Sequence, residues 1–203
     1  MTRSPARRRR AFSRTAAAVV AVLALLLAWA GFDGRLGGVP GRVADSRASE
    51  PPASVTARPA EAFPLTVTYV FDGDTIEARV GAPNDVIATT EAVRVRLIGI
   101  DTPEGTPSPE CWADEARDHL RTLLPEGSTA WAVADVQLRD RFDRALLYLW
   151  TDDGRFVNHE LASAGDAEAI LVEPNSAHYD LFLSDEASAR GAGIGQWGAC
   201  GLR

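Results

Sequence analysis

Residues 92–104 read AVRVRLIGIDTPE, and this stretch decides the fold. In its first half, apolar residues alternate with arginines, which is the pattern of a β-strand with one buried face. Two carboxylates, Asp101 and Glu104, follow the strand directly. Arg96 and Asp101 lie an odd number of residues apart, so a regular strand would place them on opposite faces. If they meet, the strand must twist or bulge, and Gly99 is the most suitable position for this.

The sequence around this strand predicts a small α+β domain. Alternating or β-branched patterns predict strands at residues 65–70, 75–80, 92–100, 129–138 and 145–150. Helical spacing of apolar residues predicts helices near residues 110–124, 157–164 and 177–190. Five short strands with the helices inserted late indicate a five-stranded OB-fold β-barrel with about three helices.

Two segments of different character precede this domain, which we place at residues 63–203. Residues 31–62 are rich in glycine and proline and lack apolar periodicity, so they are predicted to be a disordered linker. Residues 1–30 contain six arginines and no acid, and an apolar run ends at the small-residue sequence Ala28-Trp29-Ala30. This layout is typical of a signal peptide. The alternative is an uncleaved membrane anchor, because the 18 uncharged residues 15–32 are just long enough to cross a bilayer.

Both alternatives place the domain outside the cytoplasmic membrane. We therefore expect it to be secreted or held at the outer face of that membrane, with transient or single-span membrane contact through residues 15–32. Cysteine usage agrees with an oxidising compartment, since Cys111 and Cys200 are the only cysteines and neither has a partner at zinc-ligand spacing. A disulfide between them would stabilise the fold by roughly 4 kcal/mol on the chain-entropy model. Two unrelated buried thiols are the alternative.

The charge of the chain limits how it could bind a partner. Its 21 basic residues, all arginine, stand against 28 acidic ones, and residues 63–203 alone hold 11 arginines against 24 acids. Binding along nucleic acid through bulk positive charge is therefore excluded. An apolar content of 46% and a charged content of 24% also exclude wholesale disorder. A polyanionic substrate would have to be held by a few placed arginines.

Two acidic turns suggest a cation site. Asp72-Gly73-Asp74-Thr75 and Asp101-Thr102-Pro103-Glu104 are, taken singly, ordinary turn or cap sequences. If they meet in space, two aspartates and a backbone carbonyl supply the oxygen ligands that a hard divalent cation prefers, while Asp72 caps its turn. Arg96 and an arginine cluster at residues 139–144 add groups suited to bidentate phosphate binding. Cation, carboxylate and arginines together favour phosphodiester hydrolysis.

Three segments carry a family resemblance. Residues 70–75, 96–104 and 140–144 resemble, in that order, the active-site segments of the staphylococcal nuclease (thermonuclease) family. The resemblance covers about residues 63–200 and includes the short stretches 156–161, 173–175 and 195–198. It implies an OB-fold barrel with three helices that cleaves DNA and RNA with Ca²⁺ and leaves 3'-phosphate ends.

The resemblance also assigns roles by position. It makes Asp74, Asp101 and the carbonyl of Thr102 the calcium ligands. It makes Glu104 the carboxylate that deprotonates or orients water, and it places Arg96 and Arg144 on the phosphate. Finally, Cys111 and Cys200 look like the disulfide pair of some secreted relatives.

The sequence departs from the family pattern close to these residues. Asp143 stands where a glycine usually precedes the second catalytic arginine, and an ion pair with Arg144 is one expected consequence. Phe142 replaces a usual tyrosine, and Ile170 and Val172 stand where tyrosines help to hold the nucleotide. These changes bear on affinity and substrate preference more than on the chemistry.

The leading hypothesis is therefore a monomeric, calcium-dependent nuclease. Its substrate is expected to be single-stranded or flexible DNA or RNA, because an OB face with few cations cannot hold or distort a stiff duplex. The rival is a catalytically weak or inactive OB-fold module that binds a nucleotide or a cell-surface ligand, which the acidity of the domain favours. A calcium-stabilised domain without substrate is a third possibility. The histidines and tryptophans are expected to be structural.

Overall fold

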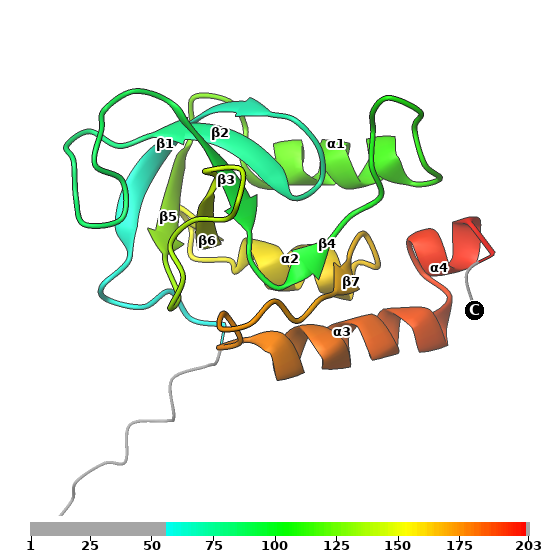
Figure 1. Ribbon diagram of the computed structural model, residues 1–203. Coiled ribbons are helices and arrows are strands. Elements are labelled where there is room, and N and C mark those ends of the chain that lie inside the picture. The colour runs from blue at the N-terminus through cyan, green and yellow to red at the C-terminus, as the bar shows by residue number, and fades with distance from the viewer. Residues whose placement is uncertain (1–55, 202–203) are drawn as a thin grey trace, which may run out of the picture. The chain divides into compact units, whose positions relative to one another are not determined.

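The computed structural model describes residues 56–201 (Figure 1). The predicted signal peptide or anchor at residues 1–30, and the predicted linker up to residue 55, lie outside the described residues. Between residues 56 and 201, no helix combines the length and the apolar character needed to cross a membrane. The membrane and domain-boundary assignments stay predictions.

Five strands form a closed barrel in the order β1-β2-β3-β6-β5. The strands are β1 (Phe63–Val70), β2 (Thr75–Arg79), β3 (Val93–Leu97), β5 (Thr129–Val133) and β6 (Ala145–Thr151). β3 and β6 run parallel, whereas the other neighbouring pairs are antiparallel. The helices are α1 (Ala113–Leu123), α2 (Val157–Ser163), α3 (Tyr179–Ala192) and the four-residue α4 (Gln196–Ala199). The α+β class and the five-stranded OB-fold barrel with three main helices are confirmed.

The core continues from the barrel into the helical layer. All seven residues of β6 are buried, because the strand is covered by the barrel interior on one face and by aromatic side chains near α2 and α3 on the other. Trp150 and Phe156 stack at 4.4 Å between ring centroids, and Phe182 of α3 packs against Phe156. α1 buries four apolar residues that recur at helical spacing, namely Ala113, Ala116, Leu120 and Leu123. The helices are thus fixed against the barrel that carries the site.

The strand predicted at residues 92–100 is interrupted, as contact between Arg96 and Asp101 required. β3 ends at Leu97, and the short strand β4 (Ile100–Asp101) begins after a turn and pairs with β7 (Glu168–Ala169). Gly99 has φ +80°, and a Cβ at this position would lie 2.7 Å from the ring of Phe182. Buried Asn158 holds the turn from below, since its Nδ2 donates to the carbonyl of Ile98 at 2.9 Å. Gly99 is therefore required by both backbone conformation and space.

Other differences from the predicted elements are small. The strand predicted to run to residue 138 ends at Val133, and neither the two-residue strands nor α4 were predicted. Cys111 and Cys200 form a disulfide with 5.9 Å between their Cα atoms and a sequence separation of 89. This bridge joins the residue before Trp112, at the start of α1, to the residue after α4, so it ties the end of the chain to the segment that follows β4.

Candidate active site

The two acidic turns meet, as the hypothesis of a shared site required. Oδ2 of Asp74 accepts hydrogen bonds from the backbone N–H and the hydroxyl of Thr102, at 2.8 and 3.0 Å. Gly73 permits this approach, because a Cβ there would lie 2.8 Å from side-chain atoms of Thr102 and Ala116. Asp74 is only 5% exposed, so its carboxylate forms the buried centre of the site.

Arg96 connects this centre to Asp101. Its Nη1 lies 3.1 Å from Oδ2 of Asp74, and its Nη2 lies 2.6 Å from Oδ1 of Asp101. Nη1 also donates to the carbonyls of Leu97 and Ile100, at 3.0 and 2.7 Å. The turn at Gly99 makes these contacts possible by folding β4 back over the guanidinium. Arg96 is therefore buried and fixed from four sides.

The site holds more negative charge than Arg96 balances. Asp72 caps its turn as expected by accepting the N–H of Asp74, and burial together with the charge of Asp74 raises the pKa of Asp72 to about 6. Burial and Asp74 also raise the pKa of Asp101, despite the guanidinium beside it. Partial desolvation, together with the charges of Asp74 and Asp101, also raises the pKa of Glu104, although most of its side chain is exposed. These shifts show that four carboxylates act on one another around a single buried guanidinium.

The donor set fits calcium. Asp74 and Asp101 offer carboxylate oxygens, which hard divalent cations prefer, and an excess negative charge that such an ion would neutralise. Within the part of the chain that the structure describes, no group of three His, Cys, Asp or Glu side chains is placed to hold a metal ion. An ion at this site would therefore take its remaining ligands from the backbone, as predicted for Thr102, and from water.

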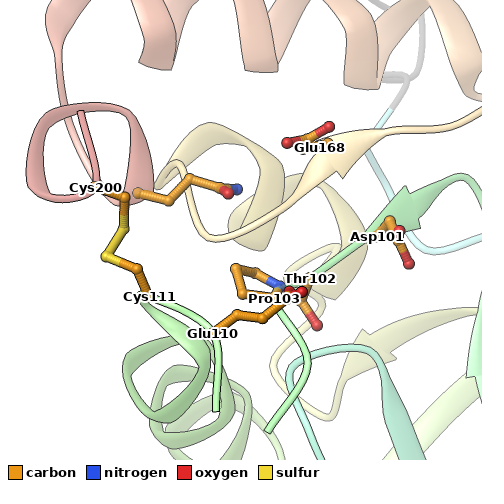
Figure 2. Close-up of a pocket in the computed structure, with 8 residues that line it drawn as sticks. Asp101, Thr102, Pro103, Glu110, Cys111, Glu168 and Cys200 are labelled. Carbon is orange, nitrogen blue, oxygen red and sulfur yellow. A yellow bond between two sulfur atoms is a disulfide. The ribbon is translucent and has the colours of Figure 1, made fainter. Parts of the chain in front are cut away.

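Glu104 lies on an ordered loop between β4 and α1. The backbone N–H of Glu104 donates to the side chain of Glu110 at 2.9 Å, and the N–H of Glu110 donates back to the carbonyl of Glu104 at 2.9 Å. The carboxylate of Glu104 is exposed to solvent, so it is accessible to water and substrate. An acidic pocket of about 500 Å³ adjoins this loop (Figure 2). Its lining residues are Asp101, Thr102, Pro103, Glu110, Cys111, Glu168, Gln196 and Cys200.

Arg144 is held by Asp140, a residue that the sequence hypothesis did not single out. Nε of Arg144 donates to Oδ2 of Asp140 at 2.7 Å, while Oδ1 accepts the N–H groups of Arg144 and Phe142 at 2.9 Å. Burial favours a higher pKa for Asp140, but these hydrogen bonds hold its pKa below the ordinary value. The signal available in the sequence was an aspartate at the start of a polar turn, a position where the side chain commonly accepts N–H groups further along the turn.

The expected ion pair between Asp143 and Arg144 is wrong. Asp143 has φ +62°, a conformation that glycine adopts readily and other residues rarely, and its exposed side chain has no ion-pair partner among residues 56–201. The turn instead directs Arg144 toward Asp140. The glycine usual at this position is thus explained by the backbone, and Asp143 occupies it under strain.

Both predicted phosphate-binding arginines line one pocket of about 380 Å³. Its walls are mostly apolar and include Phe142, Ile170 and Val172, which stand where the family pattern has tyrosines. Glu104 is not among the lining residues and is linked to the site through the charges of Asp74 and Asp101. The structure therefore brings Asp74, Arg96, Asp101 and Thr102 together through direct contacts. Arg144 lines the same pocket as Arg96, and Glu104 lies on the loop after β4.

Two of the three histidines, His119 and His159, hydrogen-bond to aspartates away from the site, and His178 packs among aromatic rings. Nδ1 of His119 lies 2.5 Å from Oδ2 of Asp166, whose Oδ1 accepts the indole N–H of Trp112. Nδ1 of His159 pairs with Asp185 at 2.6 Å and so connects α2 to α3. None of these groups lines the pocket between the arginines.

Comparison with known proteins identifies the domain. The sequence profile described as "Staphylococcal nuclease homologue" matches residues 94–199, which is more than half of the chain. The chain belongs to this family. It is 30% identical over 141 residues to Endonuclease YhcR and 28% identical over 141 residues to Endonuclease YncB, both from Bacillus subtilis (strain 168). It is also 30% identical over 134 residues to the Thermonuclease of Staphylococcus intermedius.

The share of its length that the match covers differs among these staphylococcal nuclease homologues. The matches cover 64%, 68% and 64% of this chain, but 11% of YhcR, 63% of YncB and 74% of the S. intermedius protein. The chain thus spans less than two thirds of the two B. subtilis relatives. The matched region contains every residue of the candidate site except Asp72 and Asp74, which precede the profile match.

Proposed function

We propose that the protein is a calcium-dependent nuclease that hydrolyses phosphodiester bonds of flexible or single-stranded DNA or RNA and leaves 3'-phosphate ends. One observation carries this proposal: Arg96 and Arg144 line one pocket, and Arg96 is fixed against the two carboxylates, Asp74 and Asp101, that fit a calcium ion. The names of the relatives, endonuclease and thermonuclease, support the same activity.

The arginines would bind and orient the scissile phosphate. Arg144 uses Nε for Asp140, which leaves its two terminal nitrogens for a phosphoryl oxygen pair. Arg96 is held in place by backbone carbonyls and therefore presents its charge without losing conformational freedom on binding. Both guanidiniums would stabilise the negative charge that develops on the phosphoryl oxygens in the transition state.

Glu104 would accept the proton of the attacking water. The water oxygen forms a bond to phosphorus, the bond from phosphorus to the 5' oxygen breaks, and the leaving oxygen takes up a proton to become a 5'-hydroxyl. A 3'-phosphate remains on the other fragment. Asp74, Asp101 and the carbonyl of Thr102 would hold the calcium ion, which would supply positive charge to stabilise the phosphoryl oxygens.

Secretion, or attachment to the outer face of the membrane, belongs to the same proposal. Its support is the signal-like sequence of residues 1–30 and the disulfide between Cys111 and Cys200, a bond that persists in oxidising compartments.

Cleavage assays on the full chain test the activity. Labelled single-stranded DNA and RNA are incubated with calcium or with a chelator, and product ends are typed by whether a kinase labels their 5'-hydroxyls directly. Glu104→Gln is expected to lower cleavage by at least about a hundredfold, whereas Glu126→Gln, on an exposed turn after α1, provides the matched control. No cleavage by the wild type, or equal cleavage by wild type and Glu104→Gln, would refute the nuclease. Oligonucleotide binding without cleavage would support the binding-module alternative.

A further inference from the structure

Three side chains form a cluster on the outside of the barrel, across strands β1, β2 and β3. The rings of Tyr69 and Phe71 meet edge to face with 4.8 Å between their centroids. The guanidinium carbon of Arg94 lies 4.1 Å above the Phe71 ring centroid. Tyr69 is 44% exposed and Arg94 is exposed as well. We call Tyr69, Phe71 and Arg94 the outer-face cluster.

A β-bulge places Tyr69 on this face. Val67 and Val70 are both fully buried although they lie an odd number of residues apart, because the pairing register of β1 with β2 shifts between Val67 and Tyr69. In a regular strand, Tyr69 would have followed Val67 into the core. The bulge instead exposes the tyrosine ring. Bulges commonly redirect a side chain in this way.

The outer-face cluster is continuous with the active site. Arg94 lies two residues before Arg96 on β3, so both point to the same side of the strand and are about 6.6 Å apart along it. This spacing is comparable with the distance between neighbouring phosphates in an extended single-stranded nucleic acid. Phe71 immediately precedes Asp72 and donates its N–H to the carbonyl of Thr75 at 3.0 Å. The cluster therefore adjoins the turn that carries Asp74 and the strand β3 that carries Arg96, and β2, which follows that turn, pairs with β3 (Figure 1).

The charge of the cluster suits a phosphate. Among residues 56–201, no carboxylate lies within ion-pair distance of Arg94. Glu77 separates Tyr69 from Arg94 in the cross-strand row, but its carboxylate accepts a hydrogen bond from the hydroxyl of Thr68 at 3.0 Å. Arg94 thus forms no ion pair with its cross-strand neighbour Glu77, and its guanidinium lies over the ring of Phe71.

We propose that the outer-face cluster binds the nucleotide next to the scissile phosphate in a single-stranded substrate. The base stacks on the exposed ring of Tyr69, the neighbouring phosphate pairs with Arg94, and Phe71 positions both groups. This subsite rests on the proposed nuclease function. Aromatic stacking accepts any base, and the strand 2–3 face is where OB-folds commonly bind oligonucleotides. Such a subsite supplies local affinity that the acidic domain as a whole cannot provide.

Kinetics on long and short substrates test the subsite in the full chain. Tyr69→Ser and Arg94→Gln are expected to lower kcat/KM about tenfold on a single-stranded oligonucleotide, which corresponds to about 1.4 kcal/mol, and less than twofold on a dinucleotide. Tyr69→Trp keeps a stacking surface and should restore oligonucleotide cleavage. Arg94→Gln should also reduce the slope of log KM against log salt by about 0.7, whereas Tyr69→Ser should not change it.

Arg58→Gln is the matched control. Arg58 lies 4.3 Å above the ring centroid of Trp131, in the same arrangement but beside the opposite end of β1. Equal losses on both substrates, or losses shared by Arg58→Gln, would overturn the subsite while leaving the nuclease intact. If the wild type cleaves neither substrate, the proposed function fails. Oligonucleotide binding followed by fluorescence anisotropy in chelator then decides the subsite, and equal affinity of wild type and Tyr69→Ser overturns it.

Discussion

The strained backbone at Asp143 offers a prediction in which conformation and charge can be separated. The residue has φ +62°, its N–H donates to the carbonyl of Asp140 at 3.1 Å, and its own carbonyl accepts from Nη1 of Arg139 at 3.0 Å. Both hydrogen bonds use the backbone, so any non-proline residue at position 143 keeps them. The exposed carboxylate contributes no ion pair within residues 56–201. Substitutions here therefore change only the conformational preference and one negative charge.

Three substitutions of Asp143 separate these two effects. A left-handed conformation costs an ordinary residue roughly 1–2 kcal/mol, and glycine avoids this cost but loses up to about 1 kcal/mol through the greater freedom of its unfolded chain. Asp143→Gly should thus raise the free energy of unfolding by about 0.5–1 kcal/mol, or Tm by about 2–4 °C. Asp143→Asn removes the charge while keeping a side chain that tolerates this conformation, so its stability should stay within about 0.5 kcal/mol of the wild type. Asp143→Ala should be destabilised by about 0.5–1 kcal/mol.

Urea denaturation of the four proteins gives these free energies directly, and cleavage at low salt reports the charge. All three variants lose the carboxylate beside Arg144, so each should bind substrate about twofold more tightly than the wild type at low ionic strength. The reasoning fails if glycine and alanine give equal stability, because only the Cβ distinguishes them at this position. It also fails if Asn matches Gly, since the charge alone would then explain the gain.

Further predictions concern the site and its supports. Arg96→Ala should lower the free energy of unfolding by about 3 kcal/mol in chelator, because a buried carboxylate loses its partner. In millimolar calcium the loss should be clearly smaller, because the bound ion would stabilise the folded state. An equal loss in both media would contradict calcium binding at this site. Replacing Cys111 and Cys200 together by serine should cost about 4 kcal/mol, measured by urea denaturation, and an unchanged midpoint would show that the bridge adds nothing. The hydrogen bond to Asp166 raises the pKa of His119 in the folded protein. The wild type should therefore have a higher free energy of unfolding than His119→Gln below about pH 6.5. This difference should disappear as the pH rises through the folded-state pKa of His119. A difference in the free energy of unfolding that grows with pH would contradict a raised pKa for His119.

The sequence predicted the parts of the fold that repeat regularly and the turns that carry strong local signals. The buried positions of α1 follow from their helical spacing, and the break at Gly99 follows from the odd separation of Arg96 and Asp101. The meeting of the two acidic turns was a hypothesis, and it holds because Asp74 accepts two hydrogen bonds from Thr102. Patterns of period 2 or 3.6 and obligatory glycine positions are properties of the chain itself.

Other features depended on geometry that a pattern does not contain. β4 and β7 have two residues each, which is too short for a period to appear. Proximity in sequence suggested Asp143 as the partner of Arg144, but the direction of the turn favoured Asp140. Likewise, strict alternation along β1 would place Tyr69 on the same face as buried Leu65 and Val67, and only the register shift against β2 shows that it lies outside. Partner choice and bulges are settled by tertiary contacts, so the structure was needed to find them.

Under the proposed function, the acidity of the domain and its need for a cation have the same structural cause. In the structure, one guanidinium holds both Asp74 and Asp101, so a phosphate that approaches Arg96 must compete with two carboxylates for its N–H groups. A divalent cation on those carboxylates would neutralise their two charges and so remove the competition. Under the proposed function, cation binding therefore makes Arg96 available to the substrate. An acidic domain could then bind a polyanion at this site, because the cation would neutralise the carboxylates that lie where the phosphate must bind.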